Sequence, residues 1–300
     1  TKMEYHNPVL LKETVDGLNI HPDGVYVDVT FGGGGHSREI MSRLGENGKL
    51  FAFDQDLDAL KNAIDDERFT LINENFRFIK RFLRFHGIKQ VDGILADLGV
   101  SSHQFDVAER GFSTRFDAEL DMRMNQKGDI SAYHVVNEYD EQDIARVLFD
   151  YGELKNARAM ANVIVTARKD KEIKNSDELK KVLAKFLPGH KSNKILAQIY
   201  QAIRIEVNQE MDVLKEFLEQ SLEILKPGGR LSVISYHSLE DRLVKRFVKN
   251  GMFEGEPERD FFGNFEVPFK TIEKLIVPSE EEIAINNRAR SAKLRVAEKI

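Results

Sequence analysis

The 300-residue sequence contains no cysteine, which excludes disulfide bonds and thiolate-held metal sites. Its histidines show no metal-ligand spacing either, so we expect no bound metal. No run approaches 18 apolar residues, and the first residues lack the apolar core of a signal peptide. We therefore expect no membrane span and a cytoplasmic location. The sequence also lacks an excess of positive charge, because its net charge is −6, so a polyanionic partner would have to meet local basic patches.

Apolar runs rich in Val, Ile, Leu and Phe alternate with helical patterns over the first hundred residues. This alternation is typical of an α/β fold, in which helices cover both faces of a mostly parallel sheet. The expected strands are residues 25–31, 50–53, 70–73, 93–96, 230–236, 269–276 and 293–297. The expected helices of the same part are residues 37–44, 56–64, 77–85 and 211–225.

Strand signals are missing from about residue 105 to about residue 210. We therefore expect a discontinuous α/β domain, residues 1–105 and 211–300, with an inserted helical subdomain at residues 106–210. The insert is the expected substrate-recognition part, because the α/β part is engaged by its cofactor. Its expected helices are residues 141–150, 154–169, 177–187 and 195–209.

A glycine-rich turn follows the first expected strand: Asp28-Val29-Thr30-Phe31-Gly32-Gly33-Gly34-Gly35-His36-Ser37. Glycines permit positive φ and let a ligand approach the backbone, so Gly32, Gly34 and Gly35 are candidate cofactor-binding residues. A dinucleotide fingerprint needs a third glycine where Ser37 stands, and the carboxylate of Asp28 would repel a pyrophosphate. A nicotinamide-dependent oxidoreductase is therefore disfavoured. S-adenosylmethionine, which has a sulfonium, an ammonium and no phosphate, suits the site better.

Two more carboxylates end strands, Asp54 after the second and Asp97 after the fourth. Ligands of open α/β sheets bind outside the carboxyl ends of the strands, so Asp28, Asp54 and Asp97 form one candidate constellation. Asp28 suits the amino-acid part of the cofactor, and Asp54 suits a ribose diol. The alternative is that the acids are solvated turn residues.

Long motifs extend this pattern over nearly the whole chain. They are Asp28-x-Thr30-x-Gly32-x-Gly34-Gly35-His36-Ser37, Asp97-Leu98-Gly99-Val100-Ser101-Ser102-x-Gln104, Glu109-Arg110-Gly111-Phe112-Ser113, Asp121-Met122-Arg123-Met124, Ala202-x-Arg204-Ile205-x-Val207-Asn208-x-Glu210, Ser235-x-His237-Ser238-Leu239-Glu240-Asp241-Arg242 and Arg290-Ser291-Ala292-Lys293-Leu294-Arg295. With them the chain resembles the bacterial small-subunit ribosomal RNA cytosine-N4 methyltransferases, known as RsmH or MraW. The resemblance implies a class I, Rossmann-like methyltransferase fold, S-adenosylmethionine as donor, and a cytosine in the decoding region of 16S ribosomal RNA as acceptor.

The resemblance also implies further cofactor contacts. Phe76 would pack on the adenine, although an ordinary core position is the alternative. Gln104 would lie on the cofactor side, or else be a plain loop residue. His36, at the start of a helix, would contact the cofactor through its backbone rather than act as a catalytic imidazole.

Methyl transfer from a sulfonium is an in-line displacement, so alignment and exclusion of water matter most. The cytosine N4 lone pair is conjugated with the ring, and a hydrogen-bond acceptor beside the amino group would restore its density. Asp97 and the Ser101-Ser102 turn are the candidate polar groups, although Asp97 could serve the cofactor instead. Tyr236 ends the fifth expected strand and would stack a flipped base, unless it belongs to the core.

Basic patches at residues 180–194, 242–249 and 288–299 could meet RNA phosphates, although a solvated helix face is the ordinary alternative. The candidate RNA-binding residues are Lys191, Lys194, Arg242, Arg290, Arg123 and Arg204, of which the last two could instead brace the insert. The expected partner is 16S ribosomal RNA, free or within the small subunit. The oligomeric state is open, with a homodimer as one alternative. Competing functions are methylation of DNA or protein, and a cofactor-sensing or RNA-binding protein without catalysis.

Overall fold

A computed structural model describes residues 7–99, 119–125 and 127–300 of the chain. The described residues divide into two compact units. Residues 7–99 and 211–300 form an α/β unit, and the described residues between 119 and 210 form a helical unit.

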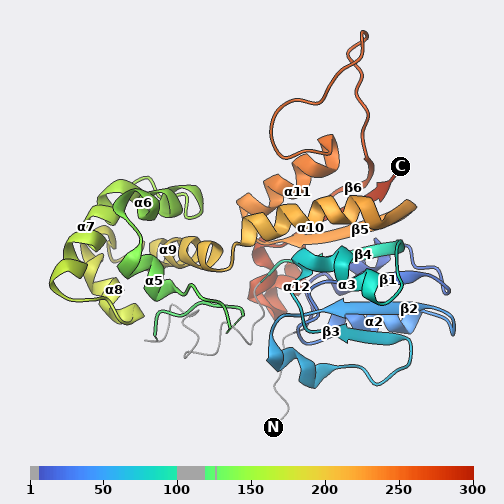
Figure 1. The fold of residues 1–300 in the computed structure, drawn as a ribbon, viewed down its shortest axis with the longest axis horizontal. Coiled ribbons are helices and arrows are strands. Elements are labelled where there is room, and N and C mark those ends of the chain that lie inside the picture. The colour runs from blue at the N-terminus through green and yellow to red at the C-terminus, as the bar shows by residue number, and fades with distance from the viewer. Residues whose placement is uncertain (1–6, 100–118, 126) are drawn as a thin grey trace. The chain divides into compact units, whose positions relative to one another are not determined.

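The α/β unit is built on one seven-stranded sheet with the order β3-β2-β1-β4-β5-β7-β6 (Figure 1). The strands are β1 (Val25–Asp28), β2 (Lys49–Phe53), β3 (Phe69–Ile72), β4 (Val91–Asp97), β5 (Leu225–Ser235), β6 (Phe269–Ile276) and β7 (Lys293–Lys299). Strands β1 to β5 run parallel to one another, whereas β7 is antiparallel to both β5 and β6. The strand order reverses between β1 and β4, where an open α/β sheet forms its binding crevice. The expected α/β, Rossmann-like class is confirmed.

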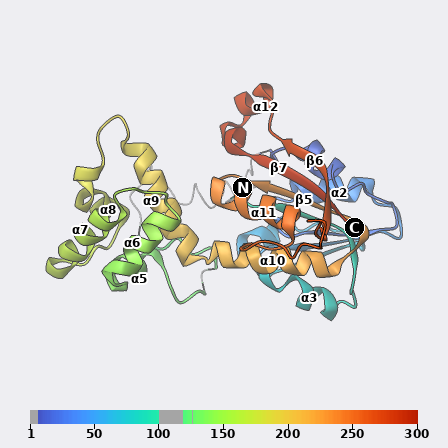
Figure 2. The same ribbon diagram turned by 90° about the horizontal axis from the view of Figure 1, so that it is seen from above.

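Helices cover both faces of the sheet (Figure 2). Successive strand residues point to opposite faces: Phe51 and Phe53 of β2 join one core cluster, and Leu50 joins the other. The helices of the α/β unit are α1 (Leu11–Asp16), α2 (Gly35–Arg43), α3 (Ile79–Phe85), α10 (Glu210–Ile224), α11 (Ser238–Asn250) and α12 (Glu280–Ile285), with 3₁₀ turns η1 (Leu57–Asn62), η2 (Phe76–Phe78) and η5 (Asn287–Ser291). Helices α1 and α2 pack on the Leu50 face, and α3, α10 and α11 pack on the Phe53 face.

The helical unit has a separate apolar core, to which Met160, Ile164 and Ile199 contribute fully buried side chains. The amphipathic spacing of such residues is what lets short helices bury one face against their neighbours. Its helices are α5 (Ala132–Glu138), α6 (Glu141–Asp150), α7 (Ala157–Asp170), α8 (Ser176–Val182) and α9 (Ser192–Val207), with a 3₁₀ turn η4 (Ala184–Phe186). Among its described residues the β pairing is a single bridge between Glu119 and Asn175.

Several expected boundaries differ from the structure. Strand β1 ends at Asp28 rather than residue 31, although the amides of Val29 and Phe31 still donate to the carbonyls of Leu95 and Phe53 before the glycine turn begins. The expected helix at 56–64 is the 3₁₀ turn η1. The Lys-Pro-Gly-Gly segment at 226–229 is not a gap before β5 but a bulge within it: Leu225 pairs with Val91 and Arg230 with Gly93.

Candidate cofactor and acceptor site

The glycine turn joins β1 to α2 and contains two left-handed residues, Gly32 with φ +52° and Gly34 with φ +83°. A β-carbon on Gly34 would lie 2.9 Å from Cζ of the buried Phe31, and one on Gly35 would lie 2.0 Å from Cγ of Pro8. A β-carbon on Gly32 would meet nothing within 4 Å. The fold itself therefore requires glycine at positions 34 and 35, whereas Gly32 borders open space where a ligand can approach the backbone.

Asp28 is fully buried at the end of β1. The hydroxyl of Ser37 donates to its Oδ2 at 2.7 Å, and the backbone amide of Thr30 donates to its Oδ1 at 3.1 Å. Burial raises the pKa of Asp28, and the nearby His36 and the Ser37 hydrogen bond oppose that rise. Asp28 thus ties the strand end to the first turn of α2, and its contact with a cofactor stays a prediction.

Asp54 follows β2 and is half-buried. The backbone amide of Gly32 donates to its Oδ2 at 2.7 Å, and the amide of Asp56 donates to its Oδ1 at 2.9 Å. Burial raises the pKa of Asp54 to about 6, although both amide hydrogen bonds favour the charged form. The carboxylate therefore lies beside the open side of the glycine turn, as a ribose-binding acid requires.

Asp97 ends β4 and is linked to β1 through a residue whose importance the sequence reasoning missed. Its backbone amide donates to the hydroxyl of Thr30 at 2.7 Å, and the same hydroxyl lies 3.4 Å from Oδ1 of Asp28. The hydroxyl of Tyr236 hydrogen-bonds to the Asp97 carboxylate. Burial raises the pKa of Asp97, while His36 and Tyr236 oppose the rise. Thr30 belongs to the motif that runs from Asp28 to Ser37, and its place in that motif is the signal that could have identified it.

His36 is buried in the first turn of α2, and its side chain has two polar neighbours. Nε2 lies 2.9 Å from the carbonyl oxygen of Val9, and Nδ1 lies 4.0 Å from Oδ2 of Asp97. A carbonyl accepts only, so we assign the proton to Nε2. In that tautomer Nδ1 faces the Asp97 carboxyl with its lone pair.

Tyr236 follows β5, and its half-buried ring packs against Gly99. Its backbone amide donates to Oε1 of the buried Glu240 at 3.0 Å. Burial, with the negative charge of Asp97 beside the hydroxyl, raises the pKa of Tyr236 well above its usual range. The phenol is therefore a hydrogen-bond donor to Asp97 at all physiological pH values.

Phe76 opens η2, directly after β3. Its half-buried ring meets the core residue Phe217 edge-on, with centroids 5.2 Å apart and planes at 84°. An edge-on contact leaves a ring face for another partner. Its packing on an adenine stays a prediction.

The structure brings the predicted site residues Asp28, Asp54, Asp97 and Tyr236 to the carboxyl ends of the parallel strands, together with the glycine turn. The other polar groups that fix the turn were not singled out from the sequence. They are Arg38, which donates to Gly33 O at 2.7 Å, Asn62, which donates to Gly32 O at 3.3 Å, and Asn73, which donates to Asp54 O at 2.9 Å. The predicted residues Ser101 and Gln104 lie outside the described residues.

The predicted RNA-binding residues differ in their surroundings. Lys191, Lys194, Arg242 and Arg290 are exposed. Arg123 and Arg204 have carboxylate partners in the helical unit: Arg123 Nε lies 2.6 Å from Asp121 Oδ1, and Arg204 Nε lies 3.0 Å from Glu210 Oε2. Their contact with RNA stays a prediction.

The geometry fits the amino-acid and nucleoside parts of S-adenosylmethionine. Gly32 borders open space, Asp54 lies beside it, and Asp28 and Asp97 end the neighbouring strands β1 and β4. Carboxylates at these strand ends suit a cofactor that carries a sulfonium and an ammonium, and their contact with it stays a prediction. Within the described ranges, no three His, Asp or Glu side chains converge as a metal site would require. No described helix combines the length and apolar character needed to cross a membrane.

A Rossmann-like sheet with this glycine turn and these three carboxylates defines the class of S-adenosylmethionine-dependent methyltransferases. Residues 3–300 match the model of the MraW methylase family, and the chain belongs to that family. It is therefore a methyltransferase, and S-adenosylmethionine is its methyl donor.

Relatives named ribosomal RNA small subunit methyltransferase H resemble the chain over its whole length. The relative from Flavobacterium johnsoniae is 82% identical over 300 residues, which cover 100% of this chain and 99% of the relative. The relative from Bacteroides thetaiotaomicron is 57% identical over 299 residues, which cover 99% and 98% respectively. Among solved structures, an rRNA methylase from Streptococcus thermophilus aligns with 96% of this chain and 95% of that chain, at a TM-score of 0.43 and 14% identity.

Proposed function

We propose that the chain transfers a methyl group from S-adenosylmethionine to the exocyclic N4 of a cytosine in the decoding region of 16S ribosomal RNA. The relatives of the same name and length support the RNA substrate. The observation in the structure that supports an amino acceptor is the Asp97 carboxylate, which ends β4 with the Tyr236 hydroxyl as its donor. A carboxylate held in this way can accept an N–H bond of the cytosine amino group.

The cofactor supplies an electrophilic methyl group on a positively charged sulfur. The residues of this chain that would hold it are Asp54 toward the ribose hydroxyls, Gly32 and Gly34 through the backbone, and Phe76 toward the adenine, with Gln104 on the same side. Asp28 holds the turn in place through Ser37 and Thr30. Because the turn is fixed before binding, little conformational entropy is lost when the cofactor is aligned.

Asp97 then orients the amino group, restores density to the N4 lone pair, and accepts the proton that N4 loses. Tyr236 holds the carboxylate through its hydroxyl and stacks the cytosine with its ring, and Ser101 completes the polar set. His36 lies beside this set, with Nδ1 4.0 Å from Oδ2 of Asp97, and would meet the cofactor through its backbone. A role of Asp97 toward the cofactor amino group is the alternative.

In this proposal the helical unit recognises the substrate. Lys191 and Lys194 of this unit contact phosphates, and so do Arg242 and Arg290 of the α/β unit. Within the helical unit, Arg123 and Arg204 stabilise the segment in which the backbone amide of Met124 donates to Oδ1 of Asn208 at 2.8 Å. The partner is the small ribosomal subunit, which implies a cytoplasmic protein. A homodimer would be detected by sedimentation.

The test uses tritiated donor with purified small subunits or protein-free 16S RNA, followed by nucleoside analysis. We expect label on N4-methylcytidine, and a loss of at least 100-fold in transfer for Asp97→Asn. The exposed Asp23 gives a control, because Asp23→Asn removes the same charge without touching the site. Label on DNA, on protein, on a base carbon or on a ribose hydroxyl would contradict the proposal, as would full activity of Asp97→Asn.

A further inference from the structure

The segment from residue 75 to residue 91 contains no acidic residue, although the whole chain carries a net charge of −6. Five cations lie within it, and phenylalanines are interleaved with them. The cations are Arg77, Lys80, Arg81, Arg84 and Lys89. The segment forms η2 and α3, which follow β3 directly.

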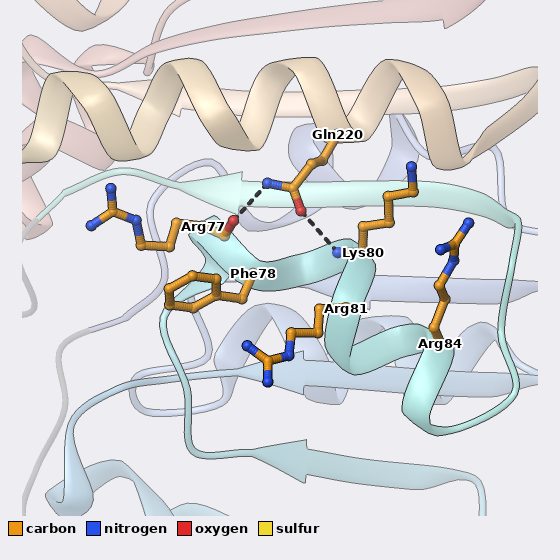
Figure 3. A pocket seen from close by; sticks show the side chains of 6 residues that line it. All are labelled: Arg77, Phe78, Lys80, Arg81, Arg84 and Gln220. Carbon is orange, nitrogen blue, oxygen red and sulfur yellow. Dashed lines mark hydrogen bonds between the residues drawn. The ribbon is translucent and has the colours of Figure 1, made fainter.

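These elements border an open hollow of about 500 Å³ on the surface of the α/β unit. Figure 3 shows its lining, which is Arg77, Phe78, Lys80, Arg81, Arg84 and Gln220. Gln220 reaches across from α10: its Nε2 donates to Arg77 O at 2.6 Å, and its Oε1 accepts from Lys80 N at 3.0 Å. The backbone under the hollow is therefore fixed to α10 by two hydrogen bonds.

The cations of this surface fall into two kinds. Arg77 pairs with Glu216 at 2.8 Å, and Lys80 pairs with Glu223, so these two cations are compensated by α10. Arg81 and Arg84 are exposed, and neither forms an ion pair with a described residue. Cζ of Arg81 lies 6.0 Å from the ring centroid of Phe82, a contact that brings no negative charge to the guanidinium. Arg81 and Arg84 can therefore meet an anionic ligand.

Two aromatic rings are exposed beside these arginines. Phe78 in the hollow is 42% exposed, and Phe85 at the end of α3 is 84% exposed. A row of cations with accessible aromatic rings is the chemistry that binds single-stranded nucleic acid, through phosphate contacts and base stacking. Cζ of Arg77 lies 5.7 Å from the ring centroid of Phe78, so that an arginine and an exposed ring adjoin on this surface. An acidic protein would use the cations but would have no need of the exposed rings.

We propose that η2 and α3 form a second RNA-binding surface, on which Arg81 and Arg84 contact phosphates of the substrate strand and Phe78 stacks an unpaired base. The surface begins one residue after Phe76, at the carboxyl end of β3, and continues along α3. A strand whose base is bound at the carboxyl ends of the strands can thus extend onto it. The inference rests on the proposed function and adds to it a contact region outside the basic patches named from the sequence.

The test compares Arg81→Gln/Arg84→Gln with a control, Lys12→Gln/Lys49→Gln, which removes two exposed cations elsewhere in the same unit. The probe is 16S RNA in small subunits and as protein-free RNA, titrated at several salt concentrations. Loss of two phosphate contacts predicts an affinity about tenfold lower at 0.1 M salt, and a salt slope smaller by roughly 1.4 for single-stranded contacts. Affinity for S-adenosylmethionine should not change.

An unchanged RNA affinity and salt slope for the arginine variant would overturn the inference, as would an equal loss in the lysine control. An acidic protein that competes with RNA for the wild type but not for the variant would assign the surface to a protein partner instead. Phe78→Ala should weaken binding of an unpaired oligonucleotide and spare a duplex, and equal effects on both would refute the stacking role. Failure of the proposed function is a separate result, since the wild type itself would then not bind or methylate the RNA.

Discussion

The ring of Tyr236 lies so close to Gly99 that a β-carbon on Gly99 would be 2.6 Å from its Cε2 atom. The hydroxyl of the same ring hydrogen-bonds to Asp97, two residues earlier in the chain. The residue at position 99 therefore controls the orientation of the carboxylate that we assign to the methyl acceptor.

Gly99→Ala should displace the Tyr236 ring and break its hydrogen bond to Asp97. Hydrogen bonds to charged groups contribute about 1.5–3 kcal/mol, so we expect methyl transfer to fall roughly 10- to 150-fold. Tyr236→Phe removes the same hydrogen bond without the steric clash, and the double variant should be little worse than either single one. Additive losses, measured as kcat/KM on small subunits, would show that the two residues act separately.

The pH dependence of methyl transfer should report the same contact. Asp97 accepts a proton only when ionised, so activity should fall as the pH drops through its raised pKa. The Tyr236 hydroxyl favours the charged form, hence Tyr236→Phe should raise the pKa of Asp97 further. The acid limb of the kcat/KM profile should then move to higher pH, whereas an unmoved limb would separate Tyr236 from the ionisation.

Asp54 predicts a second pH effect, on cofactor binding. The folded protein holds the pKa of Asp54 at about 6, so this carboxylate is protonated as the pH falls below that value. Ribose hydroxyls donate best to the ionised form, and affinity for S-adenosylmethionine should fall between pH 7 and pH 5. Calorimetry of Asp54→Asn should show weaker binding, by about 1.5–3 kcal/mol, and a flatter profile over this range.

The raised pKa of Asp54 also predicts how the stability of the folded protein changes with pH. The folded state binds this proton more tightly than the unfolded chain, so Asp54 contributes less to stability as the pH rises from about 4 to about 6. We therefore expect the free energies of unfolding of wild type and Asp54→Asn, measured with urea, to differ more at pH 7 than at pH 4.5. An equal difference at both pH values would contradict the raised pKa.

Substitutions at two glycines of the turn should distinguish an effect on folding from an effect on cofactor binding. Gly35→Ala would place its β-carbon 2.0 Å from Pro8, so we expect a loss of several kcal/mol in stability or displacement of the segment that contains Pro8. Gly32→Ala has open space around it and only the strain of φ +52°, which costs about 1–3 kcal/mol. Gly32→Ala should therefore fold and lose cofactor affinity, as measured by thermal shift with S-adenosylhomocysteine.

Substitution of Arg204 tests whether this residue stabilises the protein through its ion pair or contacts RNA. Its ion pair with Glu210 has both side chains less than 15% exposed, so Arg204→Met should destabilise the protein by about 2–4 kcal/mol. Lys191→Gln/Lys194→Gln should leave the melting temperature unchanged and weaken RNA binding. If Arg204→Met kept full stability and lost RNA affinity, the guanidinium would be an RNA contact after all.

Much of the α/β unit could be predicted because buried parallel strands are short apolar runs, and each of the seven expected strands overlaps an observed one. The acids at the strand ends were readable for the same reason: Asp28, Asp54 and Asp97 each follow such a run. The contacts that fix the site could not be predicted from the sequence. Gly35 meets Pro8 and His36 meets Val9, and each contact joins residues 27 positions apart with no periodic signal. The bulge in β5 was missed because the left-handed Gly228, with φ +84°, reads as a break.

Strand β6 precedes β7 in the sequence but lies outside it in the sheet, since β7 pairs with both β5 and β6. The edge strand β6 therefore has no partner in the sheet other than β7, the strand that follows it in the chain. Strand β5 in turn joins β4 only after a loop of more than a hundred residues has closed. Pairings between such distant segments slow folding. The joining of β5, β7 and β6 to the rest of the sheet should thus come late, while β1 to β3, joined by short connections, form early.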